Sequence, residues 1–252
     1  MVIFETIAVA FSMYSALPMP MVEWKPENLR YAMCAFPLIG VVLGGLCALW
    51  VWLCQLLALP VLIQGAGLTL LPVLVTGGIH LDGYADTWDA RSSHTSPERR
   101  AEILKDPHIG TFAVIRLCVL FVIRFALWCT MPEYDPVAVT AVFCLSRTLS
   151  GLSVAAFPLA KNTGLVHTFA TSAHKTNVRR ILLALAVLLT VVLAFCGLPG
   201  AVCAAAGWAV FGRYYRLTVA EFGGLSGDLA GWFLETGETW MLLALCLCPL
   251  VF

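Results

Sequence analysis

Eight apolar stretches separated by short polar loops constrain this chain more than any other feature of its sequence. Several of them reach the roughly 20 residues that an α-helix needs to cross a bilayer. Inside a bilayer only helices and closed barrels pair all of their backbone polar groups. The sequence therefore predicts an all-α, polytopic integral membrane bundle of about eight transmembrane spans, with residues 1–252 forming a single domain. The predicted spans cover residues 3–20, 34–58, 61–79, 111–131, 137–158, 181–197, 199–212 and 231–251.

The distribution of charge predicts how this bundle is oriented. Charged residues make up 12% of the chain, against about 25% in soluble domains. All 15 lysines and arginines except Arg116, Arg124 and Arg147 fall in alternate loops, while the loops near residues 60, 133 and 198 have none. Because basic loops stay in the cytoplasm, we expect a multi-pass protein of the cytoplasmic membrane. The net charge of zero gives no indication of a nucleic-acid partner.

An acidic motif begins where the third apolar stretch ends. Asp82, Asp86 and Asp89 are spaced i, i+4, i+7, which places all three on one face of a helix. Three carboxylates on one face repel each other, and a hard cation such as Mg²⁺ between them relieves that repulsion. The alternative is a helix N-terminus that carries acids to suit its dipole. In either case the predicted cluster lies at the cytoplasmic end of its span.

A second acidic motif near the end of the chain repeats part of this pattern. Asp228, Glu235 and Glu238 share one helical face, and carboxylates within an apolar span usually line a cavity or a site. Both motifs open with a Gly-Gly pair, and an aspartate follows four residues after its second glycine, Gly78 or Gly224. Glycines there let backbone approach a phosphate or a neighbouring helix closely. We expect the two motifs to meet in one cavity.

Four further polar residues are candidates for the same site. Arg147, in the middle of the fifth span, either pairs with a carboxylate or donates its planar fork to a diphosphate. The same two interpretations apply to Arg124 in the fourth span. Lys105 and Asp106 bring a cation and a carboxylate to the start of that span. They belong to residues 95–109, which are also typical of a solvated surface helix.

These motifs resemble a known family. Residues 80–89, with the sequence H-L-D-G-Y-A-D-T-W-D, are similar to the H-L-D-G-L-A-D-T-x-D signature of adenosylcobinamide-GDP ribazoletransferases, also called cobalamin-5′-phosphate synthases. The resemblance continues through residues 36–40, 102–110, 146–147 and 223–228, and through Glu235 and Glu238. One departure is Ala16, because the family usually has a basic residue before Leu-Pro in this segment.

The resemblance implies a membrane transferase of coenzyme B12 assembly. A hydroxyl of α-ribazole, or of its 5′-phosphate, attacks the β-phosphorus of adenosylcobinamide-GDP, GMP leaves, and adenosylcobalamin or its 5′-phosphate forms. Mg²⁺ is the implied cofactor, and a homo-oligomer remains open. We expect catalytic roles for His80, Asp82, Lys105, Asp106 and Arg147, phosphate contacts from Arg124, Arg147, Lys105, Gly78 and Gly224, and metal binding by Asp82, Asp86, Asp89, Asp228, Glu235 and Glu238. His80 either deprotonates the attacking hydroxyl or hydrogen-bonds Asp82 or a backbone carbonyl.

Two other classes of protein remain open. A CDP-alcohol phosphotransferase also combines membrane helices, acidic metal ligands and a nucleotide leaving group, but its usual D-x-x-D-G-x-x-A-R pattern is not present around Asp82-Gly83. A secondary transporter also buries acids and arginines, but more often at the middle of the membrane than at its cytoplasmic edge. Release of GMP from adenosylcobinamide-GDP would discriminate among the three.

Overall fold

The computed structural model describes residues 2–106, 108–160 and 163–251, and their regular structure is helical apart from one isolated bridge between Leu159 and Leu225. This confirms the predicted all-α class. The helices are α1 (Val2–Tyr14), α2 (Pro26–Leu29), α3 (Ala32–Leu56), α4 (Val61–Thr76), α5 (Ile79–Ser92), α6 (Pro97–Ile103), α7 (Thr111–Thr130), α8 (Pro136–Ala156), α9 (Leu165–Ser172), α10 (Lys175–Phe195), α11 (Gly197–Phe222) and α12 (Gly227–Val251).

Fewer helices than the predicted eight meet the requirements of a transmembrane span. In the described residues, α3, α7, α8 and α10 are long and apolar enough, and α4 with α5 would make a fifth, although the pair is bent by 94°. The predicted first span is the 13-residue helix α1, which at 1.5 Å per residue is about 20 Å long and shorter than the roughly 30 Å hydrocarbon core. Helices α11 and α12 are long, but both carry charged residues along their length.

The predicted boundaries of the sixth and seventh spans are too narrow. Helix α10 begins at Lys175 instead of 181, and α11 continues to Phe222 instead of ending near 212. The sequence changes from apolar to charged at Arg179, Arg180 and Arg213, but a charged residue ends an apolar run without breaking helical hydrogen bonding. The two helices are separated at Cys196, which directly follows α10 and directly precedes α11.

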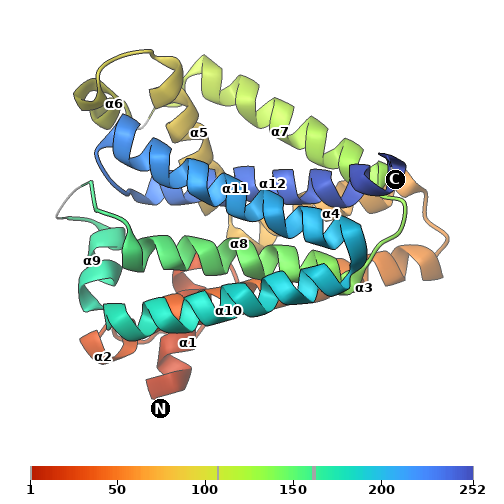
Figure 1. Cartoon of the computed structure of the whole chain (residues 1–252), viewed down its shortest axis with the longest axis horizontal. Helices are drawn as coiled ribbons and strands as arrows, with labels where there is room; N and C mark the ends of the chain where they lie inside the picture. The colour runs from red at the N-terminus through yellow and green to blue at the C-terminus, as the bar shows by residue number, and fades with distance from the viewer. Residues whose placement is uncertain (1, 107, 161–162, 252) are drawn as a thin grey trace.

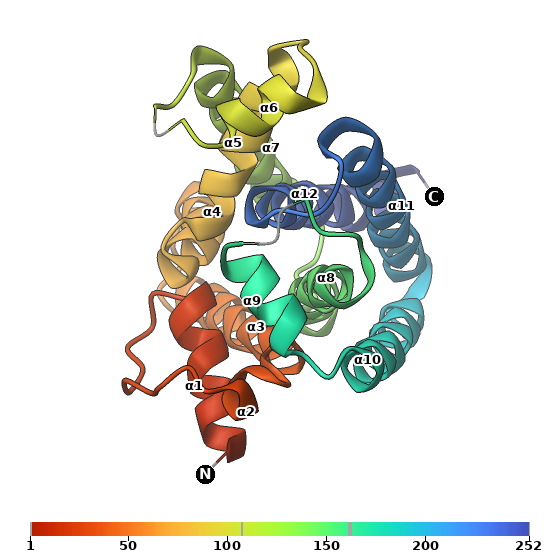
Figure 2. The same cartoon turned by 90° about the vertical axis from the view of Figure 1, so that its left-hand side faces the viewer.

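Helix α8 is the central element of the bundle. Figure 2 shows it surrounded by α3, α10, α11 and α12, and nearly all of its side chains from Ala138 to Val154 are buried. Its closest neighbour is α3, because Gly40 lies against the backbone of Phe143 and Gly44 lies against Thr140. Small residues four apart allow such close approach, which is how membrane helices gain packing contacts.

The short helices gather at one end of the bundle. Figure 1 shows α2, α5, α6 and α9 near one end of the long helices, while the turn between α10 and α11 lies at the other end. The loops that follow α8 and α11 also meet at the first end, where the N–H of Leu225 donates to the carbonyl of Pro158 at 2.7 Å. The basic loops therefore belong to the end of the molecule that carries α5 and the start of α12.

Candidate functional site

Two glycines turn the chain from the apolar helix α4 into the polar helix α5. Gly77 and Gly78 have φ angles of +66° and +80°, a left-handed conformation that costs glycine little because it has no Cβ. They produce the 94° bend between the two helices. Helix α5 therefore leaves the direction of α4 and lies across the end of the bundle (Figure 1). Asp82 sits in the first turn of α5, directly after this bend.

Helix α5 crosses α12 in backbone contact, and two more glycines allow this approach. A Cβ atom on Gly83 would lie 2.8 Å from the Cα atom of Asp228, and one on Gly231 would lie 2.7 Å from the carbonyl oxygen of His80. Any side chain at either glycine would push the helices apart. The crossing therefore brings the start of the first acidic motif to the start of the second.

The carboxylates nearest this crossing form an acidic cluster, which we define as Asp82, Asp86 and Asp228. Asp82 and Asp86 lie on the polar helix α5, which is not one of the four helices α3, α7, α8 and α10 that could each cross a membrane. Burial and the negative charges of Asp82, Asp228 and Asp89 raise the pKa of Asp86 to about 6. In the described residues, no group of three or more His, Cys, Asp or Glu side chains is arranged to hold a metal ion by itself. The mutual repulsion in the cluster is nevertheless what a divalent cation would relieve.

A cavity of about 200 Å³ opens on one side of Asp82 and Asp228. Its walls are mainly apolar and come from α1, α3, α8, α9 and α12, with His80 and Ser150 as further polar residues. On another side, Asp82 borders a surface groove of about 430 Å³, which is lined by Gly77, Gly78, Ile109 just before α7 and Leu117 within α7. Asp82 therefore lies between an apolar cavity and an open groove.

The third aspartate of the first motif has a different neighbourhood. Asp89 accepts hydrogen bonds from the N–H of Gly110 and, at 2.8 Å, from the N–H of Ala113. These are N–H groups at the N-terminus of α7, which have no partner within their own helix. The carboxylate of Asp89 thus fixes α7 to α5, and both of its oxygens are engaged.

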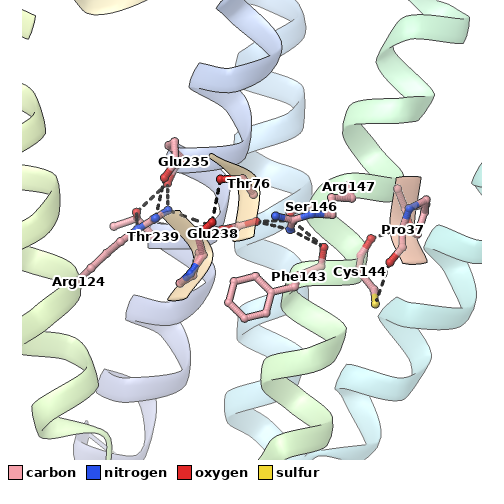
Figure 3. A network of polar contacts seen from close by, with 12 residues as sticks. Pro37, Thr76, Arg124, Phe143, Cys144, Ser146, Arg147, Glu235, Glu238 and Thr239 are labelled. Atoms are coloured by element: carbon pink, nitrogen blue, oxygen red, sulfur yellow. Dashed lines mark hydrogen bonds and ion pairs between the residues drawn. The ribbon is translucent and has the colours of Figure 1, made fainter. Parts of the chain in front are cut away.

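The two glutamates of the second motif lie deeper in the bundle, paired with the two arginines (Figure 3). An oxygen of Glu235 is 2.6 Å from Arg124 Nη1, and one of Glu238 is 2.7 Å from Arg147 Nη1. All four side chains are buried, with exposed fractions of 9% or less. Because a charge without a partner is costly at this depth, the structure gives each arginine and each glutamate a structural reason to be present.

Further hydrogen bonds complete this four-residue network. Arg124 Nη2 donates to the carbonyl of Glu235 at 2.9 Å and Nε to the hydroxyl of Thr239 at 3.0 Å, while Ser146 Oγ donates to Glu238 at 2.8 Å. The network joins α7, α8 and α12 (Figure 3). Glu235 and Glu238 are engaged by arginines and Asp89 by backbone N–H groups, so their predicted role as metal ligands has no support in these contacts.

The remaining predicted site residues lie at the surface or in the loops. Lys105 and Asp106 are exposed after α6, and Asp106 is 2.7 Å from His108 Nδ1. Gly224 adopts φ +152° and lies against the backbone of Leu159 and Ala160, where a Cβ would clash. A glycine is needed at this position because the two loops approach each other too closely for a side chain.

Comparisons with known proteins identify the family of this chain. The sequence profile of the family described as "Cobalamin-5-phosphate synthase" matches residues 6–246. This chain belongs to that family. It is 42% identical to a protein of Lachnoclostridium phytofermentans over 93% of this chain and 90% of the relative. Relatives in Desulfitobacterium hafniense and Clostridium botulinum are 33% and 29% identical, over 93% and 97% of this chain and 94% and 98% of the relatives. All three are named adenosylcobinamide-GDP ribazoletransferase. No solved structure matches the chain.

In this member of the cobalamin-5-phosphate synthase family, the position of Ala16 lies beside the site. Its N–H donates to the carbonyl of Val75 at 2.8 Å, and its Cβ would be 3.3 Å from a Cβ on Gly77. The segment after α1 therefore borders the bend between α4 and α5. A basic side chain, which the resemblance led us to expect here, would have started next to the groove.

Two groups of residues near the site are not indicated by the sequence patterns. Arg91 and Arg100 both pair with Glu221, at 3.1 Å each, and tie α5 and α6 to α11. Tyr14 and Phe36 surround His80, with ring centroids 6.4 and 6.0 Å from its own. No spacing in the sequence indicates either group, since the partners come from helices far apart in the chain.

Proposed function

We propose that this protein joins α-ribazole, or α-ribazole 5′-phosphate, to adenosylcobinamide-GDP, with release of GMP and formation of adenosylcobalamin or its 5′-phosphate. A ribose hydroxyl attacks the β-phosphorus of the GDP group, a new P–O bond forms, and the P–O bond to GMP breaks. Membership in a family whose relatives carry the name of this reaction supports the proposal. The observation that carries it is the acidic cluster of Asp82, Asp86 and Asp228 between a cavity and a groove.

The acidic cluster has the donors that Mg²⁺ prefers. We assign Asp82, Asp86 and Asp228 as the residues that would hold it, because Asp82 and Asp228 line the same cavity and Asp86 follows Asp82 by one turn of α5. Mg²⁺ usually takes one or two protein carboxylates and completes its shell with water and phosphate oxygens. When bound, it would neutralise charge that develops on the diphosphate. The diphosphate of the substrate would therefore supply the remaining ligands of the ion.

The chain's own residues would position the two substrates on either side of Asp82. The groove begins at Gly77 and Gly78, where the N-terminal N–H groups of α5 favour an anion. Lys105 is exposed four residues before Ile109, which lines the groove, and we propose that its ammonium contacts the bound diphosphate. We infer that the donor lies in the groove, with its diphosphate beside Asp82, and that positioning supplies most of the catalysis.

We also propose that the protein lies in the cytoplasmic membrane with this site facing the cytoplasm. The four basic loops precede or follow helices at the same end as α5, α6 and α9 (Figure 1), and basic loops are retained on the cytoplasmic side. Phosphorylated nucleotides are cytoplasmic metabolites, so this orientation gives the groove access to its donor. The buried ion pairs of α7, α8 and α12 would then lie toward the middle of the bilayer.

A turnover assay tests the proposed reaction. The full chain, purified and placed in lipid nanodiscs with Mg²⁺, is mixed with adenosylcobinamide-GDP and α-ribazole. We expect equimolar GMP and adenosylcobalamin, identified by chromatography and mass spectrometry, and neither product when α-ribazole is omitted. A CDP-alcohol and an acceptor alcohol serve as the alternative substrate pair. Release of CMP from that pair, with no GMP from the first, would reject the proposal.

A further inference from the structure

The apolar cavity that Asp82 and Asp228 line is separate from the groove that we assign to the donor. Its volume is about 200 Å³, whereas sites for drug-sized ligands measure about 300–1,000 Å³. It is too small for a corrinoid or for a whole nucleotide. The cavity has the size for one fused bicyclic ring. A sugar attached to that ring would extend toward Asp82 and Asp228, which line the same cavity.

His80 lines this cavity, and one buried atom of its ring has no partner in the part of the chain that the structure describes. His80 is 5% exposed, and its Nε2 atom forms no hydrogen bond within the described residues. A buried polar atom left unpaired is costly, so a ligand in this cavity that pairs with Nε2 would remove that cost. The rings of Tyr14 and Phe36 lie next to the imidazole, with Tyr14 inclined by only 24° to it, and both line the cavity.

The polarity of the walls discriminates between the two bases of the proposed substrates. Guanine carries donors and acceptors around most of its edge, and apolar residues such as Met33, Val154 and Leu234 would leave them unpaired. The base of α-ribazole is a dimethylbenzimidazole. Once one ring nitrogen carries the ribose, it retains a single polar edge atom, the other ring nitrogen, which accepts one hydrogen bond. One buried His80 nitrogen matches one such acceptor.

We propose that this cavity binds the dimethylbenzimidazole base of the acceptor, with His80 Nε2–H donating to the free ring nitrogen and with Tyr14 and Phe36 against the ring. The ribose then points out of the cavity toward Asp82 and Asp228, and the donor diphosphate approaches from the groove on the other side of Asp82. This inference rests on the proposed function, because that function supplies the acceptor. It makes His80 a residue of acceptor recognition.

Two small probes isolate the hydrogen bond. 1,5,6-Trimethylbenzimidazole has the free ring nitrogen, with a methyl group in place of the ribose, and 1,5,6-trimethylindole has the same shape but a C–H in place of that nitrogen. Dissociation constants are measured on the full chain in nanodiscs. We expect the benzimidazole to bind roughly five- to 150-fold more tightly, from the cost of an unpaired buried donor. His80→Phe should bind the two probes equally.

A second pair of variants tests the location without changing His80. Val166 on α9 lines the cavity, whereas Thr171 on the same helix is exposed and does not. Val166→Trp fills the cavity and should abolish binding of the benzimidazole probe. It should also raise KM for α-ribazole far more than KM for adenosylcobinamide-GDP. Thr171→Trp should leave both values unchanged.

The outcomes separate this inference from the proposed reaction. Loss of the benzimidazole preference in His80→Phe, together with loss of probe binding in Val166→Trp, supports the cavity as the base site. A preference that persists in His80→Phe, or wild-type probe binding by Val166→Trp, overturns it even if the wild-type protein releases GMP normally. Because probe binding needs no turnover, it also gives a result if GMP release is absent and the proposed function fails.

Discussion

At the scale of single residues, the six acidic residues of the two motifs serve three different purposes. Asp82 and Asp228 line one cavity and act electrostatically on Asp86, Asp89 holds the N-terminus of α7, and Glu235 and Glu238 neutralise two buried arginines. Removing one partner of a buried ion pair leaves an uncompensated charge and costs about 3–5 kcal/mol, whereas replacing both partners is often neutral.

Arg147 and Glu238 provide a test of this structural interpretation. We expect Arg147→Met to destabilise the protein by roughly 3 kcal/mol or more, because it leaves Glu238 buried beside fewer positive charges. The double variant Arg147→Met/Glu238→Met should recover much of the stability and part of the turnover. Thermal unfolding in detergent and GMP release are the measurements, with the exposed Arg213→Met as control. A double variant that folds as well as wild type but has no activity would instead assign Arg147 to phosphate binding.

The acidic cluster predicts that Mg²⁺ and the charge of Asp82 are linked. Asp82→Asn removes one of the repelling charges around Asp86, so the variant should have a higher Tm than wild type when no divalent cation is present. Mg²⁺ should raise the Tm of wild type by preferential binding to the folded state, and that of Asp82→Asn by much less. Differential scanning fluorimetry with and without Mg²⁺ measures both effects. Glu133→Gln, exposed at the other end of the bundle, is the control, and an equal Mg²⁺ response in all three proteins would refute the link.

At the scale of elements, the site depends on how closely α5 crosses α12. Gly83 and Gly231 let the two backbones touch, and only this contact brings Asp82 and Asp228 to the same cavity. The bend at Gly77 and Gly78 sets the direction of α5. The ion pairs of Glu235 and Glu238 fix α12 against α7 and α8. The arrangement of the acids is therefore a property of two helices and one bend.

Two glycine-to-alanine changes separate packing from helix propensity. In Gly83→Ala the new Cβ meets the backbone of Asp228 at 2.8 Å, whereas in Gly45→Ala it meets nothing within 4 Å. We expect Gly83→Ala to cost about 1–3 kcal/mol through overpacking and to reduce turnover, since the acids move apart. Gly45→Ala should be neutral or stabilise by up to about 1 kcal/mol. Stability and GMP release on both variants decide the matter, and a Gly83→Ala enzyme that matches wild type would contradict the crossing.

Local patterns in the sequence account for much of this fold but not for its pairings. The apolar runs predicted α3, α4, α7 and α8 closely, because burial in a bilayer depends on each segment's own composition. A carboxylate was one of the two partners predicted for Arg147, but spacing within a motif did not indicate that this partner is Glu238 or that Asp89 contacts α7, since these partners come from other helices. The 13-residue α1 was predicted as a span because Ser15 to Pro18 continue its apolar composition beyond the helix end.

At the scale of the whole molecule, the two ends of the bundle differ in charge and in structure. One end carries the basic loops, the acidic cluster and the short helices, and the other carries the loops near residues 58 and 133, which contain no lysine or arginine. The positive-inside rule relates this asymmetry to the two faces of a membrane. The account therefore makes a prediction about accessibility from each side.

Epitope tags inserted in three exposed loops test this orientation. A tag after Thr95 should be detected by antibody only in permeabilised cells, and tags after Ala58 and Glu133 should be detected in intact cells or spheroplasts. Each tagged protein must retain GMP release so that only folded molecules are counted. Detection of the Glu133 tag only after permeabilisation would contradict the proposed orientation.

The central claim is that the acidic cluster is the reaction centre, and the initial rate of GMP release by Asp82→Asn tests it most directly. Asp135→Asn is the matched control, because Asp135 caps the N-terminus of α8 and asparagine caps equally well. With adenosylcobinamide-GDP, α-ribazole and Mg²⁺ in excess, we predict that Asp82→Asn folds but is slower by roughly 100-fold or more, while Asp135→Asn matches wild type. A folded Asp82→Asn protein that releases GMP at the wild-type rate would contradict the account.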